Sequence, residues 1–73
     1  MNIGGSMEQT YRDHRMITER AGEKWVVRIR RLDGKPITVH GIIHPELSTA
    51  ECPDAISAIV QAKKDIDELL AQQ

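Results

Sequence analysis

The run Lys-Trp-Val-Val-Arg-Ile-Arg-Arg at residues 24–31 constrains the fold more than any other stretch, because its side chains alternate strictly in character. One side of the run carries Trp25, Val27 and Ile29, and the other side carries Val26, Arg28 and Arg30. Period-two alternation in β-branched and aromatic residues is typical of a half-buried strand. The run therefore predicts a sheet with one covered face and one face open to water.

The connection to the next predicted strand, residues 36–43, decides which side chains share a face. A two-residue turn at Asp33-Gly34 would mix apolar and polar residues on both faces. A three-residue loop that ends in a left-handed Gly34 places apolar residues opposite apolar residues on one face, so we expect this loop. The resulting pairs are Ile29 with Ile37, Val27 with Val39, Arg28 with Thr38, and Val26 with His40.

The remaining strand positions follow from proline and from chain order. Pro36 has no amide hydrogen, so the strand that begins there should lie at the edge of the sheet. An earlier strand is expected over residues 11–20 and joins the central one through residues 21–23. The predicted strand order is 1-2-3, with the most apolar strand in the centre.

The C-terminal third carries the periodicity of a helix that begins at or near Pro53, with Asp54 in its first turn. One face repeats at helical spacing and consists of Ala55, Ile59, Ala62, Ile66 and Leu69. The predicted fold class is thus α+β: a three-stranded antiparallel β-meander with one C-terminal amphipathic helix packed on one face. We expect residues 1–8 to be a flexible leader and residues 9–73 to form a single domain.

The chain has 73 residues, near the lower limit for a domain that folds alone. A single cysteine, Cys52, excludes an internal disulfide framework, so self-association is an expected source of added stability. No apolar run approaches the length of a membrane span, and the N-terminus does not resemble a signal peptide. The cytoplasm is therefore the expected compartment.

The residues that suggest enzymatic chemistry do not combine into a site. His40 and His44 lie about 13 Å apart if they share a strand, too far to bind one metal ion. Cys52 precedes a helix, which favours a reactive thiolate, but so short a chain offers little depth for a catalytic pocket. We expect Cys52 to be a half-buried structural residue, and we expect no enzyme, cofactor or small-molecule substrate.

Charge is divided unevenly: residues 1–43 carry eight Lys or Arg against five acids, and residues 44–73 carry two against six. Either Arg12 with His14, or Arg15, would extend the arginine face across the first strand, depending on its register. The candidate binding face consists of Arg28, Arg30, Thr38, His40 and Arg12.

Two functions fit that face. A non-catalytic protein-binding or assembly module, with a protein partner or a second copy in a homodimer, is the first expectation, since arginine and open strand edges are common at interfaces. The alternative is an accessory nucleic-acid-binding domain, because Arg28 and Arg30 lie about 7 Å apart, near the spacing of phosphates. This face offers no aromatic side chain on which a base could stack.

Overall fold

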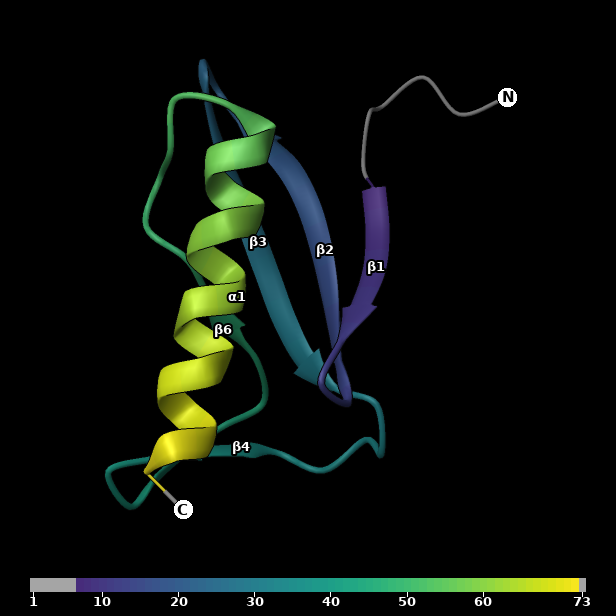
Figure 1. Ribbon diagram of the computed structural model, residues 1–73, viewed down its shortest axis with the longest axis vertical. Coiled ribbons are helices and arrows are strands. Elements are labelled where there is room, and N and C mark those ends of the chain that lie inside the picture. The colour runs from purple at the N-terminus through teal and green to yellow at the C-terminus, as the bar shows by residue number, and fades with distance from the viewer. Residues whose placement is uncertain (1–6, 73) are drawn as a thin grey trace.

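The computed structural model describes residues 7–72, which form six strands and one helix in these residues (Figure 1). The strands β1 to β3 and β6 form one antiparallel sheet in the order β1-β2-β3-β6, and β4 and β5 form a separate hairpin. The predicted fold class, a β-meander with a C-terminal helix, is confirmed. The elements are β1 Met7–Tyr11, β2 His14–Ala21, β3 Lys24–Arg31, β4 Ile37–Val39, β5 Ile42–His44, β6 Leu47–Ser48 and α1 Ala55–Ala71.

The first strand predicted over residues 11–20 is confirmed for residues 14–20, which belong to β2, but its start is wrong, because a turn at Arg12 and Asp13 separates Tyr11, in β1, from β2. Both turn residues are left-handed, with φ of 46° and 65°, a conformation usually supplied by glycine or asparagine. The leader predicted over residues 1–8 is also too long, since Met7 and Glu8 belong to β1. Its first six residues lie outside the described residues.

The predicted pairing of residues 36–43 with the central strand is wrong too. Gly34 is left-handed as expected, with φ of 77°, but the chain then leaves the sheet. A second turn at His40 and Gly41, with φ of 49° and 80°, folds residues 37–44 back on themselves as the β4–β5 hairpin. Pro36 precedes β4 and does not begin a sheet edge.

The place that the third strand was expected to occupy belongs to β6 and the residues after it. Ile29 pairs with Leu47, and Arg28 pairs with Ser48. The chain then continues along β3: the Thr49 amide donates to the Val27 carbonyl, and Cys52 exchanges backbone hydrogen bonds with Trp25. One edge of β3 is therefore closed from Trp25 to Ile29.

The core lies between α1 and the β2–β3 pair, as the alternation of the central strand predicts. Met16 pairs with Ile29 and Thr18 with Val27, so the inward side chains of both strands face the helix. The buried apolar residues are Met16, Val27, Ile29, Ile37, Ala58, Ala62, Ile66 and Leu69. Trp25 is partly buried against this core. Three of these residues come from the predicted helix face.

The helix begins at Ala55, two residues after Pro53, with Asp54 as its N-cap. The Ser57 amide donates to the Asp54 carboxylate at 2.7 Å, which holds the pKa of Asp54 below its ordinary value. In the described residues no helix is long and apolar enough to cross a membrane.

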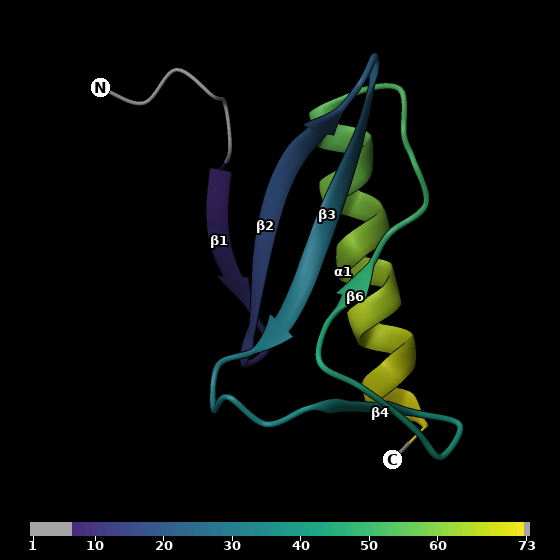
Figure 2. The same ribbon diagram turned by 180° about the vertical axis from the view of Figure 1, so that it is seen from behind.

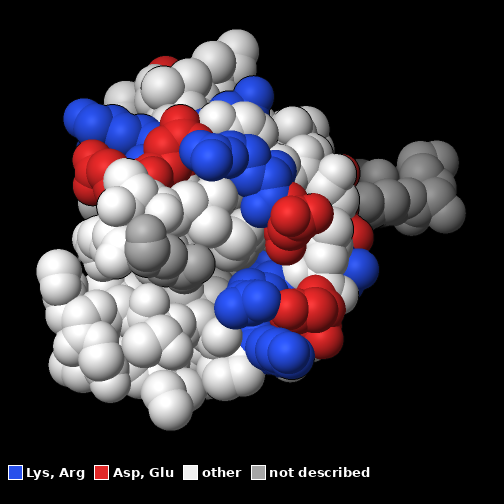
Figure 3. Space-filling model, turned by 60° about the horizontal axis from the view of Figure 1, so that its bottom comes forward, with Lys and Arg blue, Asp and Glu red and all other residues white. Residues whose placement is uncertain are grey.

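The β4–β5 hairpin lies across the end of α1 and gives that end of the molecule its character. Residues 36–45 contain no Lys, Arg, Asp or Glu. Figure 3 shows this end as a broad uncharged surface, with side chains of both charge signs lying next to one another beside it. Ile42 and Ile43 of β5 are both largely exposed there.

Candidate functional site

The face of the sheet opposite α1 is the first candidate surface, and Figure 2 shows it from the side away from the helix. Arg28 and Arg30 lie on this face, as predicted. Arg15 of β2 joins them, because it pairs directly with Arg30. Three arginines from two neighbouring strands thus share one face.

Each of these arginines is matched by an acid. Arg15 Nε lies 3.1 Å from Glu8 of β1, and Arg28 Nε lies 2.5 Å from Glu19 of β2. Glu46, just before β6, reaches Arg30 at 2.8 Å and Arg28 at 3.5 Å. The face therefore carries a ladder of ion pairs in which each of these three arginines has an acidic partner.

The other three residues of the predicted face lie elsewhere. Thr38 is in β4, and His40 is in the turn of the hairpin, because residues 36–43 do not pair with β3. Arg12 is in the β1–β2 turn and pairs with Asp67 of α1, on the helix side of the sheet. Neither Arg12 nor His14 extends the arginine face, and Arg15 does.

Arg12, Tyr11 and Asp67 tie the end of β1 to the helix. Arg12 Nη1 donates to Asp67 Oδ1 at 2.7 Å, and the Tyr11 hydroxyl donates to both carboxylate oxygens at 2.9 and 3.1 Å. The hydrogen bond from Arg12, followed by that from Tyr11, lowers the pKa of Asp67. The same carboxylate raises the pKa of Tyr11, because it accepts the phenolic proton.

The strand β1 is the second candidate surface, because it forms the open edge of the main sheet. It pairs with β2 on one side only, and four of its five residues are exposed. In Figure 1, α1 lies in front of the sheet next to β3, and β1 stands on the far side of β2 from the helix. Both the edge of β1 and part of its helix-side face are uncovered in residues 7–72.

One side of α1 faces this uncovered strand. Lys63 Nζ lies 5.4 Å from the centre of the Tyr11 ring, and Asp67 bonds the Tyr11 hydroxyl, so this side points towards β1. Ile56 and Val60 continue the same row of side chains at helical spacing. They are 76% and 61% exposed, which is unusual for two neighbouring aliphatic residues.

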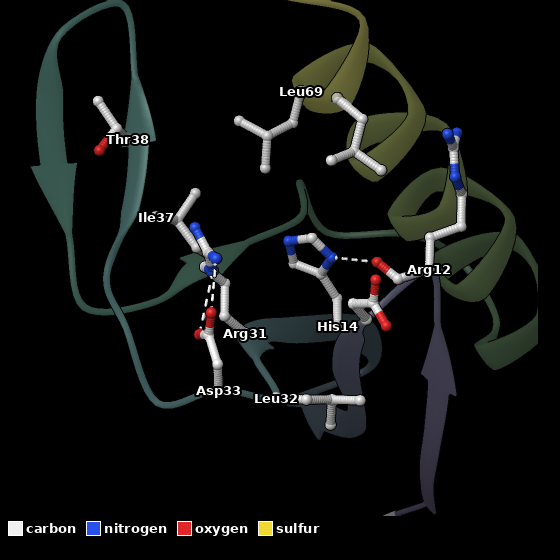
Figure 4. Close-up of a pocket in the computed structure, with 10 residues that line it drawn as sticks. Arg12, His14, Arg31, Leu32, Asp33, Ile37, Thr38 and Leu69 are labelled. Carbon is white, nitrogen blue, oxygen red and sulfur yellow. Dashed lines mark hydrogen bonds and ion pairs between the residues drawn. The ribbon is translucent and has the colours of Figure 1, made fainter. Parts of the chain in front are cut away.

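A cavity of about 470 Å³ at the other end of the sheet is the third candidate. The β1–β2 turn, the end of β3, the following loop, β4 and the last turns of α1 enclose it (Figure 4). Its lining residues are Arg12, Asp13, His14, Arg31, Leu32, Asp33, Ile37, Thr38, Leu69 and Leu70. Arg31 is held by Asp33 through Nε at 3.1 Å and Nη2 at 2.6 Å.

His14 is the buried polar residue of this cavity, with only 5% of its surface exposed. Its Nδ1 lies 2.7 Å from the Arg12 carbonyl oxygen. A carbonyl can only accept, so Nδ1 carries the hydrogen and Nε2 of the neutral ring is an acceptor. Figure 4 shows Nε2 on the side of the ring that faces Ile37 and Arg31.

The described residues contain no cluster of three or more potential metal ligands. Cys52 is half-buried, as expected, and pairs with Trp25 at one end of β3, whereas His14 pairs with Arg31 at the other. Six residues of strand separate these positions, about 20 Å. Cys52 and His14 therefore do not form a pair.

Comparison with models of protein families, with curated proteins and with solved structures found no match for this chain.

Proposed function

We propose that the protein is a non-catalytic assembly module that forms a homodimer through the open edge of β1. The observation that carries the proposal is that β1 ends the sheet with an unpaired edge and exposed side chains. An extended edge of this kind presents backbone donors and acceptors to any second strand. The opposite edge is blocked over most of β3 by β6 and residues 49–52.

The register of β1 suits pairing with a second copy of itself. Tyr11 and His14 flank the two-residue turn, and the pair in this position of a hairpin is the mutually hydrogen-bonded one. Alternation along β1 then directs the backbone groups of Glu8 and Thr10 outward. A two-fold axis through Gln9 places Glu8 opposite Thr10 of the second copy, and all the outward groups find partners.

Side-chain chemistry agrees with the same arrangement. Glu8 lies opposite a neutral threonine in the dimer and keeps its own Arg15, so no like charges are directly opposed. The helix-side face gains apolar neighbours for Met7, which is 44% exposed. Ile56 and Val60 are exposed on the side of α1 that carries Lys63 and Asp67. A domain with only eight buried apolar residues in its described part benefits from each such contact.

The ion pairs of the open face favour assembly over the nucleic-acid alternative. Phosphate binding requires cations that exchange small counterions for the nucleic acid. Arg15, Arg28 and Arg30 already face Glu8, Glu19 and Glu46. A nucleic acid would have to displace these carboxylates before it could contact the three arginines.

The dimer is tested by Thr10→Pro, which removes one outward amide, with Thr10→Ala as the matched control that keeps it. Sedimentation equilibrium from micromolar to millimolar concentration should give a dimer for the wild-type protein and for Thr10→Ala. Thr10→Pro should be a monomer with unchanged helical circular dichroism. A wild-type chain that stays monomeric at millimolar concentration would rule out this function.

Hydrogen exchange on the wild-type protein tests the register without any substitution. The amides of Glu8 and Thr10 should become protected as concentration rises, whereas the Gln9 amide should be protected throughout because it faces β2. Protection of all three amides independent of concentration contradicts the β1 interface.

A further inference from the structure

We infer that the cavity beside His14 is a binding site for a small carboxylic acid with an apolar body. This site is separate from the β1 edge and does not depend on dimer formation. Four features of the cavity support this site. They are the free ring nitrogen of His14, the turn that positions His14, the ion pairs around the cavity and the apolar wall opposite.

His14 is a buried residue, and one of its ring nitrogens, Nε2, has no protein partner among residues 7–72. Only 5% of the residue's surface is exposed. The ring makes one hydrogen bond in the described residues, from Nδ1 to the Arg12 carbonyl oxygen. The remaining nitrogen, Nε2, faces the cavity (Figure 4). A buried polar group in a native protein is nearly always satisfied, so an acceptor aimed into a cavity indicates a ligand or water that donates to it.

The turn that orients His14 is a costly one. Arg12 and Asp13 both adopt positive φ, at 46° and 65°, where a side chain is disfavoured. This conformation brings the Arg12 carbonyl to within 2.7 Å of Nδ1 and so selects the tautomer with a free Nε2. Backbone strain of this kind collects at binding and active sites.

The charges around the cavity determine which ligand fits. Arg12 is paired with Asp67, and Arg31 is paired with Asp33 through two of its three nitrogens, which leaves Nη1 as a donor. Asp13 adds a carboxylate from the turn, while Thr38, Leu69 and Leu70 of β4 and α1 add none. The site has no net positive charge, so a bare carboxylate is repelled unless a proton enters with it.

Nε2 of His14 is the group that can take that proton. The acid then binds as a neutral unit: one carboxyl oxygen shares the proton with Nε2, and the other accepts from Arg31 Nη1. Binding of a carboxylate from solution to the neutral ring thus takes up one proton. The bound acid leaves the charge of the site unchanged.

The wall formed by Leu32, Ile37, Leu69 and Leu70 suits the rest of the molecule. Ile37 and Leu69 are 1% and 5% exposed and belong to the core, so their part of the wall is rigid. A volume of about 470 Å³ lies within the range of small-molecule sites. A short aliphatic or a single-ring body fits this space better than a bare acetate, because it contacts the wall.

Isothermal titration with acetate, butyrate, benzoate and benzyl alcohol tests the inference on the full chain. Butyrate or benzoate should bind more tightly than acetate, and benzoate more tightly than benzyl alcohol. Repeating the titration in buffers of different ionisation enthalpy should show the uptake of about one proton per acid bound. Because each acid brings one proton with it, affinity should fall as the pH rises, by up to about tenfold per pH unit.

His14→Gln removes the basic nitrogen but keeps an amide that can donate to the Arg12 carbonyl, and His40→Gln in the exposed hairpin turn is the matched control. We expect His14→Gln to abolish the proton uptake and weaken acid binding at least tenfold, and His40→Gln to do neither. The inference is overturned if none of the acids binds at millimolar concentration. It also fails if benzyl alcohol binds as well as benzoate, or if His14→Gln binds like the wild type.

Discussion

The two sides of the β2–β3 pair differ in how completely their polar groups are satisfied. On the open side, Arg15, Arg28 and Arg30 each face a glutamate. On the helix side, His14 keeps one nitrogen without a protein partner in the described residues. The charged face is conspicuous in the sequence but is saturated by its own acids. By contrast, the free nitrogen of His14 faces a cavity, where another molecule can donate to it.

Side chains on the helix side of β3 should contribute much more to the free energy of unfolding than side chains on its open side. Ile29→Ala removes a side chain that is 1% exposed and should lower the free energy of unfolding by about 2–5 kcal/mol. A chain of this size has a total of only about 4–10 kcal/mol, so this variant should be close to unfolded at room temperature. Urea denaturation followed by circular dichroism measures the change.

Glu46→Gln is the counterpart on the open side, where it removes the acid shared by Arg28 and Arg30. Exposed ion pairs contribute about 0.2–1 kcal/mol, and the loss should shrink further in molar salt. A loss as large as that of Ile29→Ala would show that the ladder, and not the helix-side core, holds the sheet together.

The second prediction concerns Asp67, which joins α1 to the β1–β2 turn. Its pKa is lowered by Arg12 and then by Tyr11, so its carboxylate stabilises the fold above its unfolded pKa of about 3.9. That stabilisation is lost as the pH falls through the lower folded pKa. Asp67→Asn should therefore be less stable than wild type at neutral pH and approach it in strong acid.

Tyr11 gives a direct readout of the same contact, because it is the only tyrosine in the chain. The Asp67 carboxylate raises its pKa, so Asp67→Asn should bring the phenol pKa down towards its ordinary value. Ultraviolet absorbance of the phenolate measures this shift. Asp65→Asn, which keeps both partners of Asp67, is the control, and an equal shift in that variant would contradict the assignment.

The parts of the fold that were predicted correctly all depend on burial patterns within one element. Alternation at residues 24–31 identified β3 and its helix-facing side, and helical spacing identified the inward face of α1. Arg28 and Arg30 were placed on the open face for the same reason. Such patterns are set by which side of a single element meets the core, so the sequence is enough to read them.

The errors depend on turns and on partners far away in the chain. The turn at Arg12 and Asp13 has no glycine or proline, and Arg12 is held by Asp67, which is far away in the chain. Gly41 is a signal for the hairpin turn, but the predicted pairing relied on the turn at Gly34 alone. β6 has only two residues, so its pairing with β3 leaves no periodic trace. The burial of His14 follows from the register that the 12–13 turn sets.

The smallest expected effect tests whether strain is stored beside His14. Asp13→Gly relieves a positive φ of 65° and should raise the free energy of unfolding, by about 0.5–1 kcal/mol after the greater flexibility of the unfolded chain is subtracted. Glu23→Gly, in the β2–β3 turn, is the matched control. Glu23 does not have a positive φ, so glycine there should lower stability by a similar amount. Thermal unfolding of both variants measures the opposite signs. Equal losses of stability in the two variants would mean that Asp13 is not strained in its turn. The open face and the cavity would then differ only in the free nitrogen of His14.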